Sequence, residues 1–113
     1  MENNNPEIFK YFRIGDVIKD SADSIWGETK FIIQSFHGNW YLPLVSALQY
    51  GKPNMNRYKC NFDVRLLRLV DSRNRPFRKL EKTKLIKLVS KGVTEAKREL
   101  LIRANNKKNV NYV

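Results

Sequence analysis

The side chains of this chain that could do chemistry are mostly cationic, and they gather in its second half. The 113 residues include 22 Lys and Arg against 11 Asp and Glu, which gives a formal net charge of +11. Residues 1–56 carry a net charge of −1, whereas residues 57–113 carry +12. Such a one-sided distribution repels itself, and it is typical of a protein that binds a polyanion.

The densest run of cations spans residues 73–91. Its arginines lie in a polar connection, where each guanidinium can form a forked contact with a phosphate. On a helix over 83–91, Lys84, Lys87 and Lys91 share one face, turned about 150° from the apolar side. Lys97 and Arg98 extend this patch. We therefore predict that these residues bind a nucleic acid, mainly through its phosphate backbone: Arg73, Arg75, Arg78, Lys79, Lys84, Lys87, Lys91, Lys97 and Arg98.

The segment Gly92-Val93-Thr94 resembles the turn of a helix-turn-helix motif. Two positions that this motif keeps apolar are occupied here by Lys87 and Arg98. Both would point between the two helices, where an unpaired cation is costly to bury. We therefore favour a plain helical hairpin over a helix-turn-helix that reads DNA.

Aromatic side chains near expected strand ends and turns form a second candidate surface. They are Trp40, Tyr41, Tyr50, Tyr58 and Phe77. On small barrels such residues can stack the bases of a single strand. For Trp40, packing at the end of a barrel is the preferred interpretation.

Arrangements that would support catalysis or metal binding are sparse. His37 is the single histidine and Cys60 the single cysteine, which excludes a histidine-based triad or a zinc cluster within one chain. Asp16 together with Glu28-Thr29-Lys30 loosely resembles the carboxylates and lysine of metal-dependent nucleases. Turn and strand-start interpretations of these residues are preferred, so we predict a non-enzymatic protein without a cofactor or metal.

The elements that must position these side chains begin with a β part over residues 12–70. Hydrophobic, β-branched and aromatic residues form four expected strands there, and turn-forming residues separate them. The strands are a short one over 12–18 with a kink or bulge at Gly15, then 29–36, 40–48 and 58–66. Pro43 lacks an amide donor, which places its strand at a sheet edge or a bulge. We predict a small antiparallel β-meander or SH3-like barrel.

The last third of the chain switches to helical spacing. A basic connection over 71–79 leads into a helical hairpin at about residues 80–106, and a polar tail follows at 107–113. Gly92 suits the end of the first helix, and Thr94 can cap the second. The fold class predicted is α+β, in a single domain.

Side-chain patterns predict how the two helices are used. The first should dock its apolar side on the β part and aim its lysines outward. The second carries an apolar stripe, and Glu99 and Arg103 are spaced for an i,i+4 ion pair. The stripe consists of Val93, Ala96, Leu100 and Ala104.

Two classes of function remain open at this point. The first is a nucleic-acid-binding accessory protein. The sequence does not distinguish DNA from RNA as its ligand, or single from double strands. The second is a small interaction module, such as an inhibitor or virion component, whose basic half docks an acidic protein. A homo-oligomer would suit the second class. The richness in Asn and Lys suits an AT-rich source such as a phage or mobile element.

A membrane partner is not expected from the sequence. The apolar side of the basic helix is short and lacks Trp or Phe, which an interfacial helix would use as anchors. The first residues show no signal-peptide pattern, which predicts a cytoplasmic or intravirion location.

Overall fold

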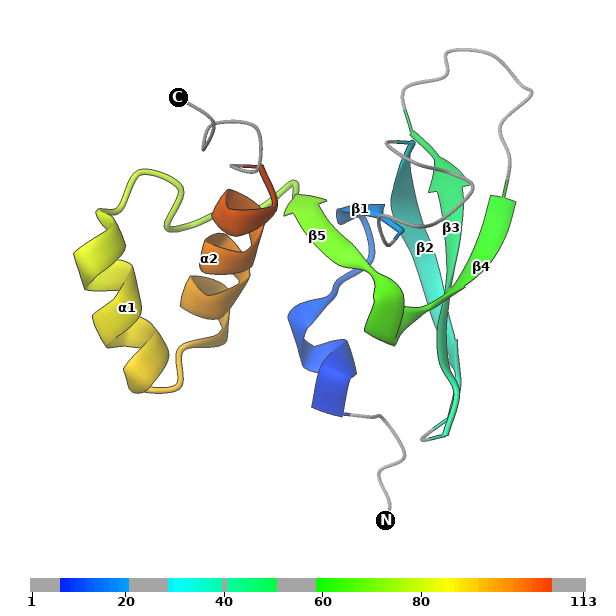
Figure 1. Ribbon diagram of the computed structural model, residues 1–113, viewed down its shortest axis with the longest axis horizontal. Helices are drawn as coiled ribbons and strands as arrows, with labels where there is room; N and C mark the ends of the chain where they lie inside the picture. Colours follow the sequence, from blue (N-terminus) through cyan, green and yellow to red (C-terminus); the bar gives the residue numbers. More distant parts are fainter. Residues whose placement is uncertain (1–6, 21–28, 40, 51–58, 107–113) are drawn as a thin grey trace.

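The computed structural model describes residues 7–20, 29–39, 41–50 and 59–106 (Figure 1). It contains an antiparallel sheet followed by two helices, as the α+β prediction expected. The strands are β1 (Val17–Lys19), β2 (Lys30–Gly38), β3 (Pro43–Gln49), β4 (Lys59–Asp63) and β5 (Arg68–Asp71). The helices are α1 (Lys82–Ser90) and α2 (Thr94–Asn106), with 3₁₀ turns η1 (Glu7–Tyr11) and η2 (Val64–Leu66).

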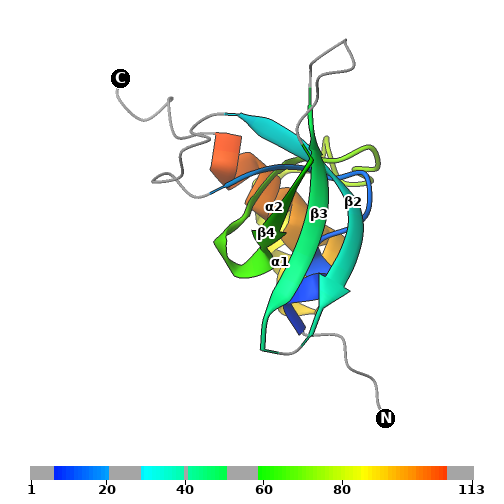
Figure 2. The same ribbon diagram turned by 90° about the vertical axis from the view of Figure 1, so that its right-hand side faces the viewer.

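The sheet has the strand order β4-β3-β2-β1-β5. The first four strands form a meander, and the chain then returns through η2 so that β5 pairs with β1. Strands β2, β3 and β4 lie side by side and curve strongly (Figure 2). Because β4 and β5 are the two edges and do not pair with each other, the sheet stays open. The meander prediction is confirmed, whereas the barrel is not closed.

Alternation along the strands builds the core. Phe31 and Ile33 on β2 are fully buried, as is Val45 on β3, because every second side chain of a strand points to the same face. Phe31 meets Phe62 of β4 edge to face, with ring centroids 4.8 Å apart. Ile102 of α2 belongs to the same buried cluster, so α2 helps to cover the inner face of the sheet.

The strand expected over 58–66 ends at Asp63. The Asp63 carboxylate accepts a hydrogen bond from the backbone N–H of Arg65 (2.9 Å) and pairs with its guanidinium (2.6 Å). This local cap turns the chain into the 3₁₀ turn η2 instead of continuing the strand. Alternation of apolar residues alone could not show this, because Val64 is buried in either conformation.

The prediction of an edge strand or bulge at Pro43 is wrong. Pro43 is the first residue of β3, a central strand that lies between β2 and β4. It pairs with Gly38 of β2, while pairing with β4 begins only at Leu44. The missing N–H therefore falls where no β4 partner is present, a position that proline tolerates in a strand.

The helical hairpin forms as predicted, but its docking differs. The helix α1 packs against α2 and stands apart from the sheet, so the prediction that it docks on the β part is wrong (Figure 1). Gly92, at φ 85°, ends α1 in a conformation that glycine adopts without strain. Thr94 is the first helical residue of α2, not its cap, because the Val93 carbonyl accepts the first helical bond. In the ranges described, no helix is both long and apolar enough to cross a bilayer.

Candidate nucleic-acid interface

Arg98 is buried in the structure, although the sequence analysis placed it in the nucleic-acid patch. Its side chain is 3% exposed and pairs with Asp16, which is 1% exposed, at 2.6 Å and 3.0 Å. It also donates to the carbonyl of Tyr11 and to the hydroxyl of Ser72, each at 3.0 Å. This guanidinium ties α2 to the turn before β1. Arg98 therefore does not face solvent, and its assignment as a phosphate ligand is wrong.

The turn over residues 13–16 positions the Asp16 carboxylate for this pair. This carboxylate accepts from the backbone N–H of Arg13 (2.8 Å), and the Asp16 N–H donates back to the Arg13 carbonyl (3.0 Å). Ser72 Oγ donates to the other carboxylate oxygen (2.8 Å). Both oxygens are therefore engaged inside the protein, which argues against the nuclease-like interpretation of Asp16. Glu28, the second carboxylate of that interpretation, lies outside the described residues.

A second cluster forms around Glu99 on α2. Arg75 pairs with it at 2.7 Å and 3.0 Å, and Arg103 at 2.9 Å, so the predicted Glu99–Arg103 pair is confirmed. The Arg103 guanidinium also donates to the carbonyls of Phe77, Arg78 and Leu80. The cluster thereby fastens the connection after β5 to α2. Arg75 lies within this cluster and also pairs with Asp71 (3.3 Å), so it does not stand free for phosphate.

The Glu99 cluster should make stability depend on pH. Burial would raise the pKa of Glu99, but hydrogen bonds from Arg75 and Arg103 outweigh it and hold this pKa below its ordinary value of 4.5. At pH values between the pKa of Glu99 in the folded state and its ordinary pKa, the unfolded chain binds more protons than the folded chain. The stabilisation is therefore present above the ordinary pKa, and it is lost as the pH falls through the lower pKa of the folded state.

We expect Glu99→Gln to flatten the acid limb of the stability curve. The free energy of unfolding, measured by urea titration at a series of pH values from 6 to about 3, should fall less steeply in this variant than in the wild type. Glu81→Gln is the matched control, because Glu81 is exposed and makes no ion pair within the described ranges. Equal slopes for Glu99→Gln and the wild type would contradict the role of Glu99.

The lysines of α1 have a different environment from these arginines. Lys84 and Lys87 of α1 and its C-cap residue Lys91, which together we call the α1 basic face, are all exposed. The opposite side of α1 packs on α2 through Leu85, which is fully buried. None of the three lysines forms an ion pair within the part of the chain that the structure describes. They stand on the outermost element of the molecule (Figure 1).

Carboxylates in the described second half mostly pair with arginines. Asp63 pairs with Arg65, and Glu95 pairs with Arg13 and Arg98. Asp71 pairs with Arg75, and Glu99 pairs with Arg75 and Arg103, as described above for the Glu99 cluster. Guanidinium groups suit such forked internal pairs better than ammonium groups do. These acids therefore neutralise arginines. Glu81, the cap residue before α1, is exposed and pairs with no cation in the described ranges, so it is the one acid beside three lysines that likewise have no ion-pair partner there.

The remaining predicted site residues lie in three places. Arg78 and Lys79 are exposed in the turn before α1, and Lys97 is half-buried on α2. Arg73 is exposed but lies beside Gly15, next to β1 rather than next to α1. Arg78 and Lys79 thus precede the α1 basic face in the chain, whereas Arg73 lies at Gly15, next to β1.

The aromatic candidates also separate. Tyr41 and Tyr50 are exposed at opposite ends of β3, and Phe77 is half-buried in the connection before α1. Trp40 and Tyr58 lie outside the described residues. A single aromatic platform of all five is therefore not formed by the residues that the structure describes.

No protein-family model, curated protein or solved structure matches this chain. The function is accordingly inferred from the geometry and chemistry of the surface itself.

Proposed function

We propose that this protein is a non-enzymatic nucleic-acid-binding accessory protein that holds the phosphate backbone with the lysines of α1. The observation that supports this most is that the three lysines of the α1 basic face are exposed and have no ion-pair partner among the described residues. Internal carboxylates are paired with arginines, so the electrostatic field of these exposed lysines extends into solvent. An ordinary solubilising surface mixes both signs instead.

The spacing of the α1 basic face suits a regular polyanion. Lys84 and Lys91 are two turns apart, which is about 10 Å along the helix axis. This length corresponds to about three steps of a nucleic-acid strand at 3.4 Å each. Arg78 and Lys79 precede the helix and lengthen the row of cations. Contacts of this kind position a nucleic acid without reading its sequence.

The test is the salt dependence of binding. About five contacts, from the α1 basic face with Arg78 and Lys79, predict a slope near −4.5 in a plot of log affinity against log salt for duplex DNA. Fluorescence anisotropy with labelled duplex and single-stranded oligonucleotides measures it. Binding that does not respond to salt would overturn the proposal.

A matched pair of variants locates the surface. We expect Lys87→Glu to weaken binding about tenfold at 0.1 M salt and to reduce the slope by about 1, because one phosphate contact is lost. Lys59→Glu makes the same charge change on β4, where Lys59 is also exposed. It should bind nearly as the wild type does. Equal losses in the two variants would show that net charge, not α1, controls binding.

An acidic protein partner is the second candidate. Ile86, 50% exposed on α1, lies one turn after Lys82. An apolar side chain among lysines can also fit an acidic peptide that carries a hydrophobic residue. Mass measurement of the purified protein with and without nuclease distinguishes the classes. Nucleic acid that co-purifies favours the first, and a defined homo-oligomer free of it favours the second.

A further inference from the structure

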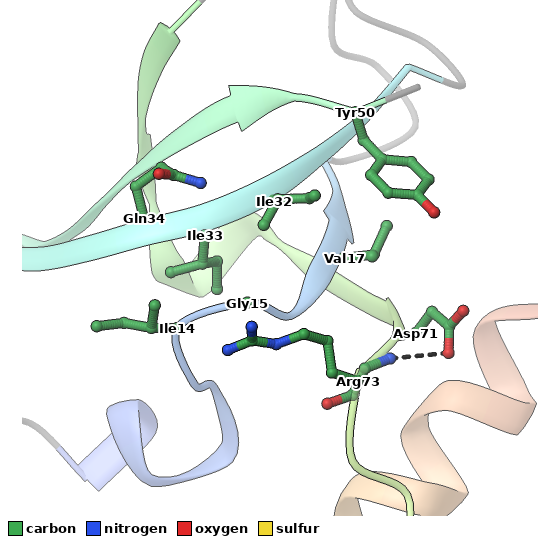
Figure 3. Close-up of a pocket in the computed structure, with 10 residues that line it drawn as sticks. Ile14, Gly15, Val17, Ile32, Ile33, Gln34, Tyr50, Asp71 and Arg73 are labelled. Atoms are coloured by element: carbon green, nitrogen blue, oxygen red, sulfur yellow. Dashed lines mark hydrogen bonds between the residues drawn. The ribbon is translucent and has the colours of Figure 1, made fainter. Parts of the chain in front are cut away.

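A groove of about 550 Å³ runs along the outer face of β1 and β2 (Figure 3). Phe31 and Ile33 point into the core, so Ile32 between them points to the opposite face. Val17 of β1 pairs with Ile32, and these two side chains form an apolar floor with Ile14. The volume is in the range of sites that enclose a small organic group.

Tyr50 stands at one end of this groove. It is 47% exposed, and Figure 3 shows its ring beside Val17 and Ile32. Its backbone is fixed, because its N–H donates to the Lys30 carbonyl at 2.8 Å. Its hydroxyl makes no hydrogen bond within the described ranges. A fixed, half-exposed aromatic ring beside an apolar floor is a platform on which a flat ring can stack.

Arg73 lies across the other end. Its guanidinium rests against Gly15, where a Cβ atom would lie only 2.6 Å from Nε, so a side chain at 15 would displace it. Gly15 also has φ 94°, which favours glycine. Within the described residues Arg73 makes no ion pair or side-chain hydrogen bond. A cation is thus placed at the groove without an anion from the protein.

Two carboxylates lie near Arg73, and both already have other partners. Asp71 is two positions away in the chain, and Asp16 follows Gly15, against which the guanidinium lies. Asp16 pairs with Arg98, and one oxygen of Asp71 accepts from Arg75 and from the N–H of Ser72. Asp71 also lines the groove. Its carboxylate can accept a hydrogen bond from an N–H group on the edge of a base, and the Gln34 amide, exposed on the rim, offers both a donor and an acceptor.

We propose that this groove holds one unpaired base of a single-stranded nucleic acid. Tyr50 stacks on the base, the apolar floor excludes water beneath it, and Arg73 binds the adjacent phosphate. A base within a duplex is stacked and paired, so it could not enter. This inference rests on the proposed function, and it adds that single strands are the preferred class.

The experiment uses the full chain and two fluorescent probes of equal length, a ten-nucleotide oligothymidine and a ten-residue abasic strand with the same phosphates. We expect the wild type to bind oligothymidine about tenfold or more tightly than the abasic strand, because stacking contributes only to the first. Tyr50→Ala should bind the two strands equally, and Tyr50→Phe should keep the preference. Arg73→Gln should weaken binding of both strands and lower the salt slope by about 0.7, the contribution of one phosphate contact in a single strand.

Each outcome separates the two proposals. If the wild type binds both strands equally, or if Tyr50→Ala keeps the preference, the base site is overturned while phosphate binding stands. If the wild type binds neither strand nor a duplex, both proposals fall. If an acidic peptide with an aromatic residue competes for Tyr50 while oligothymidine does not, the groove is a peptide site instead.

Discussion

Replacing Arg98 with alanine is expected to lower the free energy of unfolding by about 3–5 kcal/mol, the usual cost of removing one partner of a buried ion pair. Asp16 would keep a buried carboxylate without its cation, since its other partners are a hydroxyl and a backbone N–H. For a domain of this size, such a loss is a large share of the total stability. Urea titration at pH 7, followed by circular dichroism, measures it.

Three further variants test whether the pair is the cause. Lys97→Ala changes the neighbouring residue of α2, which makes no ion pair within the ranges described, and it should change stability by less than about 1 kcal/mol. The double variant Asp16→Asn/Arg98→Met removes both charges. It should be more stable than Arg98→Met alone, because no unpaired charge then stays buried. A small effect of Arg98→Ala, below about 1 kcal/mol, would contradict this account.

Reversing the α1 basic face is expected to produce the largest loss of nucleic-acid binding. Lys84→Glu/Lys87→Glu/Lys91→Glu removes three proposed phosphate contacts, so the slope of log affinity against log salt should fall by about 3. The counterion contribution to the affinity vanishes near 1 M salt. Over the tenfold lower salt concentration, at about 0.1 M, three contacts therefore contribute a few hundredfold to the affinity. Anisotropy titrations across salt concentrations measure both quantities.

The same three positions provide the control. Lys84→Arg/Lys87→Arg/Lys91→Arg keeps the charge, and it should bind within about threefold of the wild type, because phosphate contacts depend mainly on charge. Neither triple variant should unfold the protein, since these lysines are exposed and make no ion pair in the described part of the chain. A glutamate variant that is folded and still binds tightly would remove α1 from the proposed interface.

Local patterns predicted most elements correctly. Alternation placed the strands around Phe31 and Val45, and helical spacing with Gly92 placed the hairpin, because side-chain periodicity follows directly from backbone geometry. Side-chain hydrogen bonds to the backbone, which can end a strand within an alternating pattern, were not predicted. Asp63 capped the next turn and ended β4 early.

Docking was harder to predict than the elements themselves. The apolar side of α1 showed that this side would be buried, but not which element would cover it. It met α2 rather than the sheet, since an amphipathic pattern carries no information about its partner. In α2, the predicted apolar stripe included Ala104, which is exposed, while Arg98 and Glu99 are buried.

The sequence by itself determined the α+β class, the meander followed by a hairpin, and the excess of cations in the second half. Only the tertiary structure decided which cations are neutralised. Arg98 meets Asp16 across 82 positions of the chain, and Arg75 meets Glu99 across 24. Composition counts charges but not distances, whereas a buried charge persists only where folding brings an opposite charge within hydrogen-bonding reach.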